Sequence, residues 1–335
     1  MKTNINFFEL RKLFIRVKNV LLVAHPNPDL DCLCAMKVIQ FLLNRYFAKK
    51  PVLYSKDPIP SQYSDLFCDV VNSVDVQNFD CIIAVEVGSF NRFKEVVGNT
   101  DSKIIINIDH HFSNDLFGNY YYVDVDSSSV NEVLYDIIKQ TGIPIDSDIA
   151  YYLVMGVISD TGVLSYNNLT SKTLCMLSEL RNYVDWNSII RKIRSRSFEY
   201  YKMLSTIYRN LDRYDEIVYS YLSFDDLQEL EKLGFKRGDL NNVIENISFV
   251  SQGETFFVIF EVEPSFCRVS MRSRSIDVES IARKFGGGGH KKAAGFKINY
   301  DYKSLIQVLI NEIKSQGKVL QEKHYLEAKN GDSTC

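Results

Sequence analysis

Short apolar runs alternate with longer segments of helical period over roughly the first 180 residues of the chain. The apolar runs are Val20–Val23, Val52–Tyr54, Cys81–Val87 and Lys103–Ile108, and the clearest helical segments are Cys32–Phe47 and Val130–Gln140. This alternation favours a mostly parallel sheet covered by helices. We therefore expect an N-terminal α/β domain.

The pattern changes after the amphipathic segment Ser171–Tyr183. Residues 185–214 are polar and of helical period, which predicts a helical connector rather than a flexible linker. Beyond them, strands pair with helices, which predicts a smaller α+β domain. The expected strands are Ile217–Phe224, Ser248–Ser251, Thr255–Val262, Phe266–Arg272 and Phe296–Ile298, and the expected helices are Asp225–Leu233 and Tyr302–Gln316. The predicted division is 1–184, 185–214, 215–318 and a frayed polar tail, 319–335.

Composition narrows the class of protein. With 335 residues, 46% of them hydrophobic, the chain can bury two substantial cores. A net charge of −3 argues against a protein that coats long nucleic acid, although it leaves room for a local basic pocket. The N-terminus loses its apolar character too early for a signal peptide, and no segment is apolar enough to span a membrane.

The seven cysteines form no CxxC pair, and their odd number fits no closed disulfide framework. They indicate a reduced, cytoplasmic protein. Cys32 and Cys34 flank an acidic cluster, but we interpret them as core residues rather than thiolate ligands, because harder ligands crowd the same segment. The sequence leaves the oligomeric state, monomer or homodimer, open.

Four clusters of carboxylates and imidazoles follow apolar segments. The clusters are His25, Asp29 and Asp31 after Val20–Ala24; Glu86 after Cys81–Val85; Asp109-His110-His111 after Ile104–Ile108; and Asp160-Thr161-Gly162 after Leu153–Ile158. Parallel α/β sheets bind ligands at the carboxyl ends of their strands. The chain has only five histidines, and three of them lie in these clusters. Together the clusters predict one polynuclear metal site.

Each cluster also has a plain structural interpretation. Asp29 or Asp31 could cap the helix that follows, and Gly162 could end a helix. Glu86 could close an ordinary strand, and Asp109-His110-His111 could be a solvated loop. The combined set of imidazoles and carboxylates nevertheless suits hard divalent ions such as Mn²⁺ or Mg²⁺. Two such ions about 3.5–4 Å apart would activate a water and clamp a phosphate, which is the chemistry of phosphoester hydrolysis.

A glycine run, Gly286–Gly289, precedes His290 and two lysines in the second region. The stretch from Arg268 to Lys292 carries seven basic residues against two acidic ones. A tight turn beside a solvated basic face would explain this pattern. Glycine backbone N–H groups can also cradle an anion beside arginine side chains, so we interpret the stretch as a phosphate or carboxylate reader.

On these motifs the chain resembles the DHH phosphoesterase superfamily, which is named for the triplet seen at Asp109-His110-His111. The run Ser127-Ser-Ser-Val-Asn-Glu132 strengthens the match. The second region resembles the DHHA1 domain through Ser270-Met-Arg272-Ser273 and Gly286–Gly295. The resemblance covers about residues 18–310. It implies a DHH domain and a DHHA1 domain with the active-site cleft between them.

The resemblance also implies two Mn²⁺ ions, with Mg²⁺ or other divalent ions as substitutes. On the family pattern His25, Asp29 and Glu86 hold one ion, and Asp31, Glu86, His110 and Asp160 hold the other. Asp109 orients ligands and His111 faces the phosphate or a leaving oxygen. The residues carried over to substrate binding, besides His111, are Arg268, Arg272, Ser273, Gly288, Gly289 and His290.

Two departures from the family pattern stand out. Glu86 replaces the usual Asp, which extends the carboxylate by about 1.5 Å, and Cys34-Ala35 replaces the usual Gly-Ser. The leading hypothesis is a Mn²⁺-dependent phosphodiesterase on short nucleotides: pApA, nano-RNA dinucleotides and 3′-phosphoadenosine 5′-phosphate. Hydrolysis of cyclic di-AMP is the close alternative. A catalytically impaired nucleotide-binding protein is the second, and a structural α/β protein with incidental acids is a third.

Overall fold

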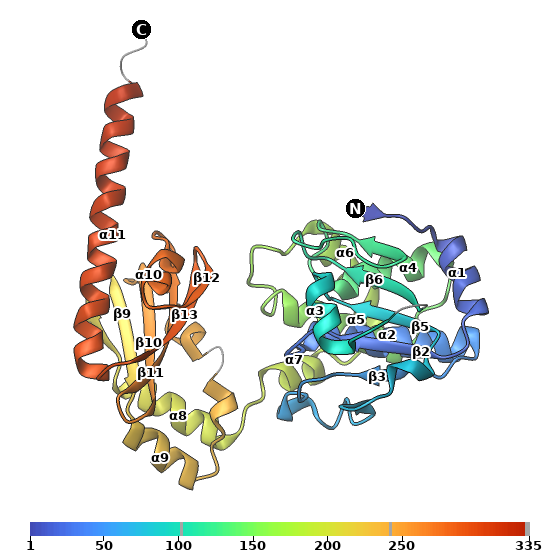
Figure 1. The fold of residues 1–335 in the computed structure, drawn as a ribbon, viewed down its shortest axis with the longest axis horizontal. Coiled ribbons are helices and arrows are strands. Elements are labelled where there is room, and N and C mark those ends of the chain that lie inside the picture. The colour runs from blue at the N-terminus through green and yellow to red at the C-terminus, as the bar shows by residue number, and fades with distance from the viewer. Residues whose placement is uncertain (101–102, 241–242, 332–335) are drawn as a thin grey trace. The chain divides into compact units, whose positions relative to one another are not determined.

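The computed structural model describes residues 1–100, 103–240 and 243–331 (Figure 1). It divides into two compact units, Met1–Ser195 and Arg196–Cys335. The predicted connector, residues 185–214, begins with helices α7 (Trp186–Arg194) and α8 (Phe198–Arg209), which belong to different units. Within the described residues, no helix is both long and apolar enough to cross a membrane.

The N-terminal unit is built on a seven-stranded sheet in the order β1-β7-β6-β5-β2-β3-β4. Its strands are β1 (Lys2–Thr3), β2 (Val20–Ala24), β3 (Val52–Tyr54), β4 (Val70–Val71), β5 (Cys81–Val85), β6 (Ile104–Asp109) and β7 (Tyr120–Val123). All neighbouring pairs are parallel except the edge pair β1–β7. The predicted parallel α/β architecture is confirmed.

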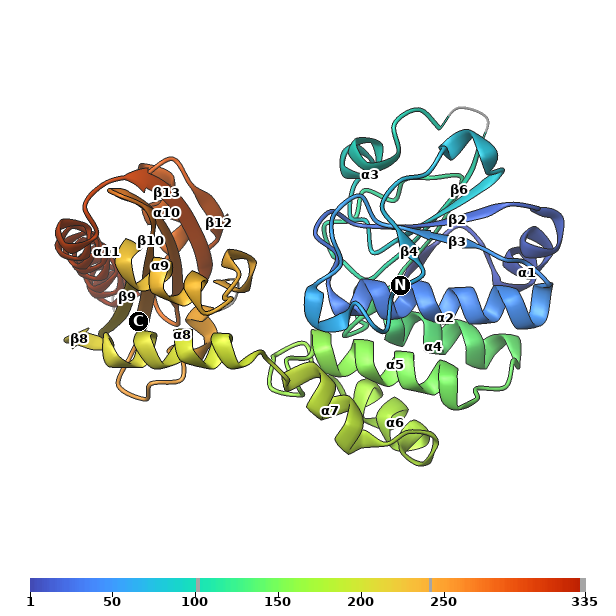
Figure 2. The ribbon, with the colours of Figure 1, turned by 90° about the horizontal axis from the view of Figure 1, so that it is seen from below.

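Both faces of this sheet are buried, which is why the central strands β2 and β5 are apolar at every position. Along β2, Leu22 packs into one core and Leu21 and Val23 into the other. Helices α1 (Phe7–Arg16), α2 (Leu30–Phe47), α4 (Val130–Thr141), α5 (Ser147–Asp160) and α6 (Ser171–Leu180) contribute to the first core. Helix α3 (Phe90–Val97) packs on the opposite face, as Figure 2 shows.

The C-terminal unit holds a six-stranded sheet in the order β12-β13-β11-β10-β9-β8. Its strands are β8 (Asp212–Tyr214), β9 (Ile217–Leu222), β10 (Thr255–Glu263), β11 (Phe266–Ser273), β12 (Gly288–His290) and β13 (Ala293–Asn299). Helices α8 and α9 (Phe224–Lys232) cover one face, and α10 (Val278–Lys284) and α11 (Tyr302–Gly331) cover the other. The predicted mixture of strands and helices is confirmed.

Two expected elements differ in the structure. The predicted strand Ser248–Ser251 is wrong: these residues follow the 3₁₀ turn Val243–Asn246, whose buried Val243, Ile244 and Ile247 recur at helical spacing. Helix α11 continues to Gly331 through most of the expected tail. This segment is rich in Lys, Glu and Leu and lacks proline, so helix propensity favours the extension. Residues 332–335 lie outside the described residues.

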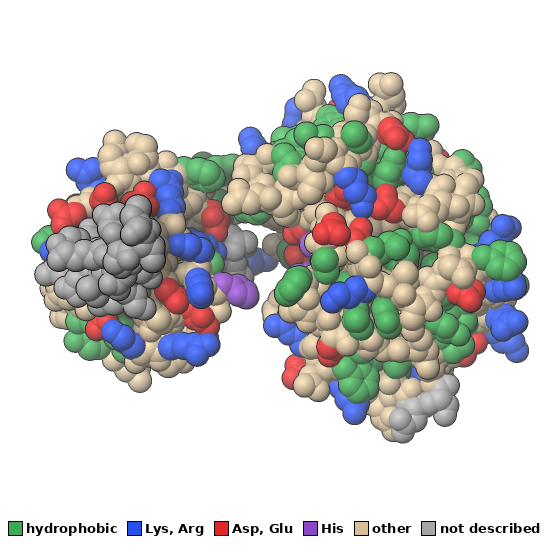
Figure 3. Space-filling view, turned by 90° about the horizontal axis from the view of Figure 1, so that it is seen from above, with side chains coloured by type: hydrophobic (Ala, Val, Ile, Leu, Met, Phe, Trp, Pro, Cys, Tyr) green, Lys and Arg blue, Asp and Glu red, His purple; other side chains and the backbone are tan. Residues whose placement is uncertain are grey.

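The two units carry mixed surface charge. Lys and Arg side chains are interspersed with Asp and Glu on the visible face of each unit (Figure 3). This arrangement matches the small net charge of −3.

Candidate metal centre

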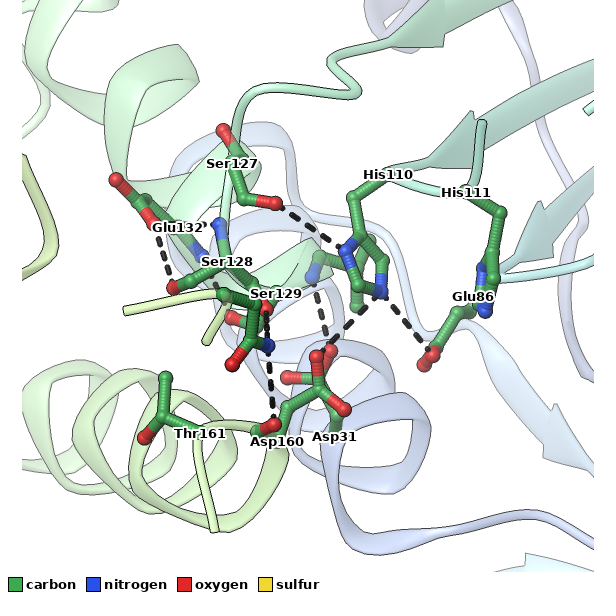
Figure 4. Close-up of polar contacts among 12 residues, drawn as sticks. Asp31, Glu86, His110, His111, Ser127, Ser128, Ser129, Glu132, Asp160 and Thr161 are labelled. Atoms are coloured by element: carbon green, nitrogen blue, oxygen red, sulfur yellow. Dashed lines mark hydrogen bonds and ion pairs between the residues drawn. The ribbon is translucent and has the colours of Figure 1, made fainter. Parts of the chain in front are cut away.

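The predicted ligands come from elements that end at one edge of the N-terminal sheet. His25 follows β2, Glu86 follows β5 and His110 follows β6, and these three strands are parallel neighbours. Their carboxyl ends therefore lie side by side. Asp31 stands in the first turn of α2, and Asp160 is the last residue of α5. Figure 4 shows His110 between Glu86 and Asp160, with Asp31 beside them.

Three groups of side chains have ligand atoms within 4.8 Å of one another. They are His25, Cys32 and Glu86; Glu86, His110 and His111; and Asp31, His110 and Asp160. Glu86 and His110 each belong to two groups, so the three form one continuous cluster. Five of the six predicted metal ligands take part.

The sixth predicted ligand, Asp29, is placed differently. It is the N-cap of α2 and accepts a hydrogen bond from the Cys32 amide at 3.0 Å. Its carboxylate also lies 3.7 Å from His25 Nε2. Burial alone would raise the pKa of Asp29, but the nearby imidazole of His25 lowers it. Asp29 therefore caps helix α2 and also lies next to the ligand His25.

Several buried atoms of the cluster lack partners. Among the residues that the structure describes, Glu86 Oε2, His110 Nε2 and Asp160 Oδ2 are buried without a hydrogen bond. His110 Nε2 lies 3.5 Å from Glu86 Oε1 and 3.7 Å from Asp160 Oδ2, beyond hydrogen-bonding distance. Buried polar atoms are almost always paired. Unpaired nitrogen and oxygen atoms facing one another fit divalent ions.

The carboxylates of the cluster are costly to ionise together. Burial, followed by repulsion from Asp31 and Asp29, raises the pKa of Asp160 to about 8. Burial and the same two carboxylates raise the pKa of Glu86 well above its usual range. Burial also raises the pKa of Asp31. A bound cation would reverse this balance, because it favours the charged forms.

The histidines are held in the tautomer that a metal requires. His25 Nδ1 lies 2.9 Å from the Pro26 carbonyl, and His110 Nδ1 lies 3.3 Å from the Ser127 carbonyl. A carbonyl oxygen can only accept, so Nδ1 carries the proton in both rings. Each Nε2 is left as the lone-pair donor, an arrangement common to metal-binding histidines.

Asp109 and His111 do different work. Asp109 is fully buried, and its Oδ1 accepts from both histidine amides, at 2.7 and 3.1 Å, and from His111 Nδ1 at 2.8 Å. Its Oδ2 accepts from Asn114 at 2.5 Å. The hydrogen bond to Asp109 raises the pKa of His111, whose side chain is 48% exposed. Asp109 thus fixes the loop, and His111 presents an accessible ring whose protonated form Asp109 favours.

A loop at the start of α4 supports two of the predicted ligands. Asp31 Oδ2 accepts from the Val130 amide at 2.8 Å, and Asn131 Nδ2 donates to Asp31 Oδ1 at 2.7 Å. Glu132, fully buried, accepts from the amide and hydroxyl of Ser128 and so fixes the loop whose Ser127 carbonyl orients His110. The sequence analysis used Ser127–Glu132 only as a family signal and missed this positioning role.

Gly156 of α5 allows this arrangement. A Cβ there would lie 2.0 Å from Asn131 Nδ2 and 2.8 Å from Asp31 Oδ1. No side chain larger than hydrogen fits without moving the support of Asp31. The sequence offered no sign of this contact, because a lone glycine in a helix has many explanations.

Glu86 has an unusual backbone conformation. Its φ is 59°, in the left-handed region, and its amide donates to the Ile108 carbonyl at 2.8 Å. A residue other than glycine held in this region costs on the order of 1–3 kcal/mol, and such residues cluster at functional sites. The turn at Glu86 points its carboxylate into the cluster rather than along the strand (Figure 4).

A second candidate site is a cavity of about 540 Å³ in the C-terminal unit. Four of the predicted substrate residues line it: Arg268, Arg272, Gly288 and Gly289. Burial lowers the pKa of Arg268. Arg272 is paired with Glu245, with its Nε and one terminal nitrogen each 2.9 Å from the carboxylate. An anion entering this cavity would compete with Glu245 for that guanidinium.

Two other predicted substrate residues lie elsewhere. Ser273 is buried, and its hydroxyl accepts from the amides of Ser275 and Ile276, which fixes the turn after β11. His290 is exposed at the end of β12. Gly289 has φ 146°, and a Cβ there would lie 2.5 Å from the Ala293 carbonyl. The glycine requirement at this position therefore comes from strand pairing.

Exposed Phe112 was also missed. It follows His111 directly and is 85% exposed, the largest such fraction among the large hydrophobic side chains of the described residues. An accessible aromatic ring of this kind can stack on a planar group.

Comparisons with known proteins agree with this anatomy. Residues 19–157 match the DHH family N-terminal domain, and residues 215–316 match the DHHA1 domain. The bifunctional oligoribonuclease and PAP phosphatase NrnA of Bacillus subtilis is 25% identical over 296 residues, which cover 87% of this chain and 92% of the relative. The probable NrnA of Streptococcus mutans is 24% identical over 82% of this chain and 88% of its own.

Among solved structures, an exopolyphosphatase-related protein from Bacteroides fragilis superposes with a TM-score of 0.81. It is 19% identical, and the match covers 94% of this chain and 97% of that one. This likeness shows that the fold is shared.

Proposed function

Because the chain belongs to the DHH family and carries a DHH domain followed by a DHHA1 domain, we propose that it is a metal-dependent phosphodiesterase of short nucleotides. The observation that carries the proposal is the set of buried, unpaired atoms of Glu86, His110 and Asp160 beside the accessible His111. The substrates are pApA, nano-RNA dinucleotides and 3′-phosphoadenosine 5′-phosphate. Curated relatives bearing oligoribonuclease and PAP phosphatase names support this choice.

In the proposal two Mn²⁺ ions are held by His25, Asp31, Glu86, His110 and Asp160, with Asp29 at the margin. Bound there, such ions supply Lewis-acid activation of a water and neutralise phosphate charge. The protein's own part is to place these groups. Glu86 links the group of His25 to the group of His110. The Ser127 carbonyl orients His110, and Asn131 holds Asp31.

His111 is the proposed proton donor. Its hydrogen bond to Asp109 raises its pKa, which favours the protonated form of the ring. A charged imidazole can donate to a phosphate oxygen or to the leaving oxygen of the scissile bond. Asp109 acts through His111 and through the two amides that it accepts from, not by touching the substrate.

Substrate choice in the proposal rests on Phe112 and on the C-terminal cavity. Phe112 offers a face for one base, and Arg268 and Arg272 offer guanidinium groups for a phosphate. The interspersed surface charge supports short substrates over long polyanions (Figure 3). Six described cysteines are free thiols, which fits a reducing cytoplasmic location.

The test is release of AMP from pApA by the purified protein with Mn²⁺. The expected result is turnover that EDTA abolishes and that Mn²⁺ restores. His111→Gln should lower kcat by about 10²–10⁴-fold, the usual contribution of general acid–base catalysis, without loss of bound metal. Nucleotide binding with no turnover would instead support the impaired-enzyme alternative motivated by Glu86 and Cys34.

Cyclic di-AMP is the second candidate substrate, since it presents the same phosphodiester and base chemistry. A parallel series with cyclic di-AMP, pApA, longer oligo-A and 3′-phosphoadenosine 5′-phosphate ranks the candidates. If kcat/KM is higher for cyclic di-AMP than for pApA, the proposed function becomes hydrolysis of cyclic di-AMP, which would control the level of that second messenger.

A further inference from the structure

Cys32 lies inside the metal centre. Its Sγ belongs with His25 and Glu86 to a group whose ligand atoms are all within 4.8 Å of one another. The side chain is fully buried in the first turn of α2. We expected this thiol to be a core residue because harder ligands crowd the segment, and it does pack in the first core. The structure places it among those ligands.

All three side chains of this corner have an atom free to bind an ion. Glu86 is 4% exposed, and its Oε2 is buried without a partner among the described residues. His25 Nε2 presents a lone pair, because Nδ1 is bonded to the Pro26 carbonyl. The Cys32 thiol donates to the Val85 carbonyl at 3.3 Å, and a thiol is a weak donor. Little is lost when that hydrogen bond is given up.

We propose that Cys32, His25 and Glu86 bind a thiophilic divalent ion such as Zn²⁺ through a thiolate, in addition to the Mn²⁺ chemistry of the centre. The inference rests on the proposed function, because His25 and Glu86 are shared with it. On binding, the Cys32 S–H bond breaks, its proton passes to solvent, and a sulfur–metal bond forms.

The distances allow this coordination with small movements. Zinc binds sulfur at about 2.3 Å and nitrogen or oxygen at about 2.0–2.2 Å, so tetrahedral ligand atoms lie roughly 3.5 Å apart. The present separations, up to 4.8 Å, close with shifts on the order of 1 Å. Thiolate, imidazole and carboxylate together are a zinc set, whereas Mn²⁺ prefers oxygen. Zn²⁺ should therefore displace Mn²⁺ from this corner and inhibit turnover.

Cys34 provides a matched control. It lies on the same helix two residues further along and is equally buried. It belongs to none of the three ligand groups found among the described residues. Serine at position 32 keeps a donor for the Val85 carbonyl, and serine at position 34 makes the same chemical change away from the ion.

The experiment titrates the metal-free protein with Co²⁺, a spectroscopic substitute for Zn²⁺, and records the near-ultraviolet sulfur-to-cobalt charge-transfer band. Wild type and Cys34→Ser should show the band, and Cys32→Ser should lose it while still binding Co²⁺ by equilibrium dialysis. Cys32→Ser should also weaken Zn²⁺ binding by at least about tenfold, and change Mn²⁺ binding far less. Circular dichroism confirms that both variants are folded.

Each other outcome has a definite meaning. A band that survives in Cys32→Ser assigns the signal to another thiol, such as exposed Cys68 or Cys175, and overturns the inference. Wild-type protein that binds Co²⁺ without the band also overturns it, while the proposed metal centre stands. If wild-type protein binds neither Co²⁺ nor Mn²⁺, the proposed metal-dependent function is itself refuted.

Discussion

Replacing Gly156 with alanine should both destabilise the N-terminal unit and weaken metal binding. The new Cβ would lie 2.0 Å from Asn131 Nδ2, 2.6 Å from its Cγ and 2.8 Å from Asp31 Oδ1. Ordinary contacts between carbon atoms lie near 3.5–4.0 Å, so Asn131 must move by more than about 1 Å. That movement breaks its hydrogen bonds to the Asp31 backbone and carboxylate, now 2.8 and 2.7 Å.

The expected change in unfolding free energy combines one stabilising and two destabilising contributions. Alanine in a helix is favoured over glycine by about 1 kcal/mol. Overpacking costs about 1–3 kcal/mol, and loss of a hydrogen bond to a charged group costs about 1.5–3 kcal/mol. The net loss of unfolding free energy is roughly 1.5–5 kcal/mol. Because Asp31 loses its supporting partner, Mn²⁺ affinity should fall about 10–100-fold.

The chain contains a convenient reporter and a control. Trp186 is the single tryptophan and lies in the N-terminal unit, so its fluorescence during urea unfolding reports that unit alone. Gly317 is also helical, in α11, but a Cβ there would meet nothing within 4 Å. Gly317→Ala should leave the Trp186 transition and Mn²⁺ affinity unchanged. If Gly156→Ala matches wild type in both measurements, Asn131 does not hold Asp31 in place.

Four further outcomes are expected. Glu86→Gln should raise the melting temperature of EDTA-treated protein, because it removes a carboxylate disfavoured by burial and repelled by Asp29 and Asp31. The same change should reduce the stabilisation by Mn²⁺, and a lower metal-free melting temperature would contradict the reasoning. Since the pKa of Asp160 is about 8 when folded and about 4 when unfolded, its neutral form stabilises the metal-free protein fully below about pH 4. That stabilisation is lost up to about pH 8, so the melting temperature should fall over this range and Mn²⁺ should remove the fall; a flat profile would refute the shift. Phe112→Ala should raise the KM for pApA about 5–100-fold through lost stacking, with metal content intact, and an unchanged KM would exclude stacking. Arg272→Ala should raise the KM for pApA far more than it lowers the metal content. Comparable losses of substrate binding and metal content would instead indicate a structural role for Arg272.

The ligand cluster could be predicted because its geometry follows from topology. His25, Glu86 and Asp109 each stand at the carboxyl end of a strand. Because those three strands are parallel neighbours, the three residues must lie close together. The identity of each of these residues can be read from the sequence beside its own strand. A linear pattern is sufficient for such a site.

The support of the cluster could not be predicted in the same way. Asn131 touches Asp31 across 100 residues of sequence, and Gly156 matters only because both meet there. Ser273 makes a contact of the same kind, because its hydroxyl accepts from an amide in a turn that the sequence does not reveal. Its role in substrate binding stays a prediction. Contacts of this kind depend on packing between elements rather than on periodicity.

Glu86 shows why its substitution for aspartate is not conservative. The longer side chain alone would carry the carboxylate outward, but the left-handed backbone at this residue turns it into the cluster. From there it belongs both to the group of His25 and Cys32 and to the group of His110 and His111. An aspartate at this position would relieve part of the backbone strain, since Asp tolerates the left-handed region better. Its reach would be shorter by one methylene, so it would have to give up one of the two groups or draw both inward. The strained Glu86 and the thiol of Cys32 lie in one group of neighbouring ligand atoms. The proposed thiolate ligand and the turn at Glu86 would therefore both distinguish this centre from one built on aspartates.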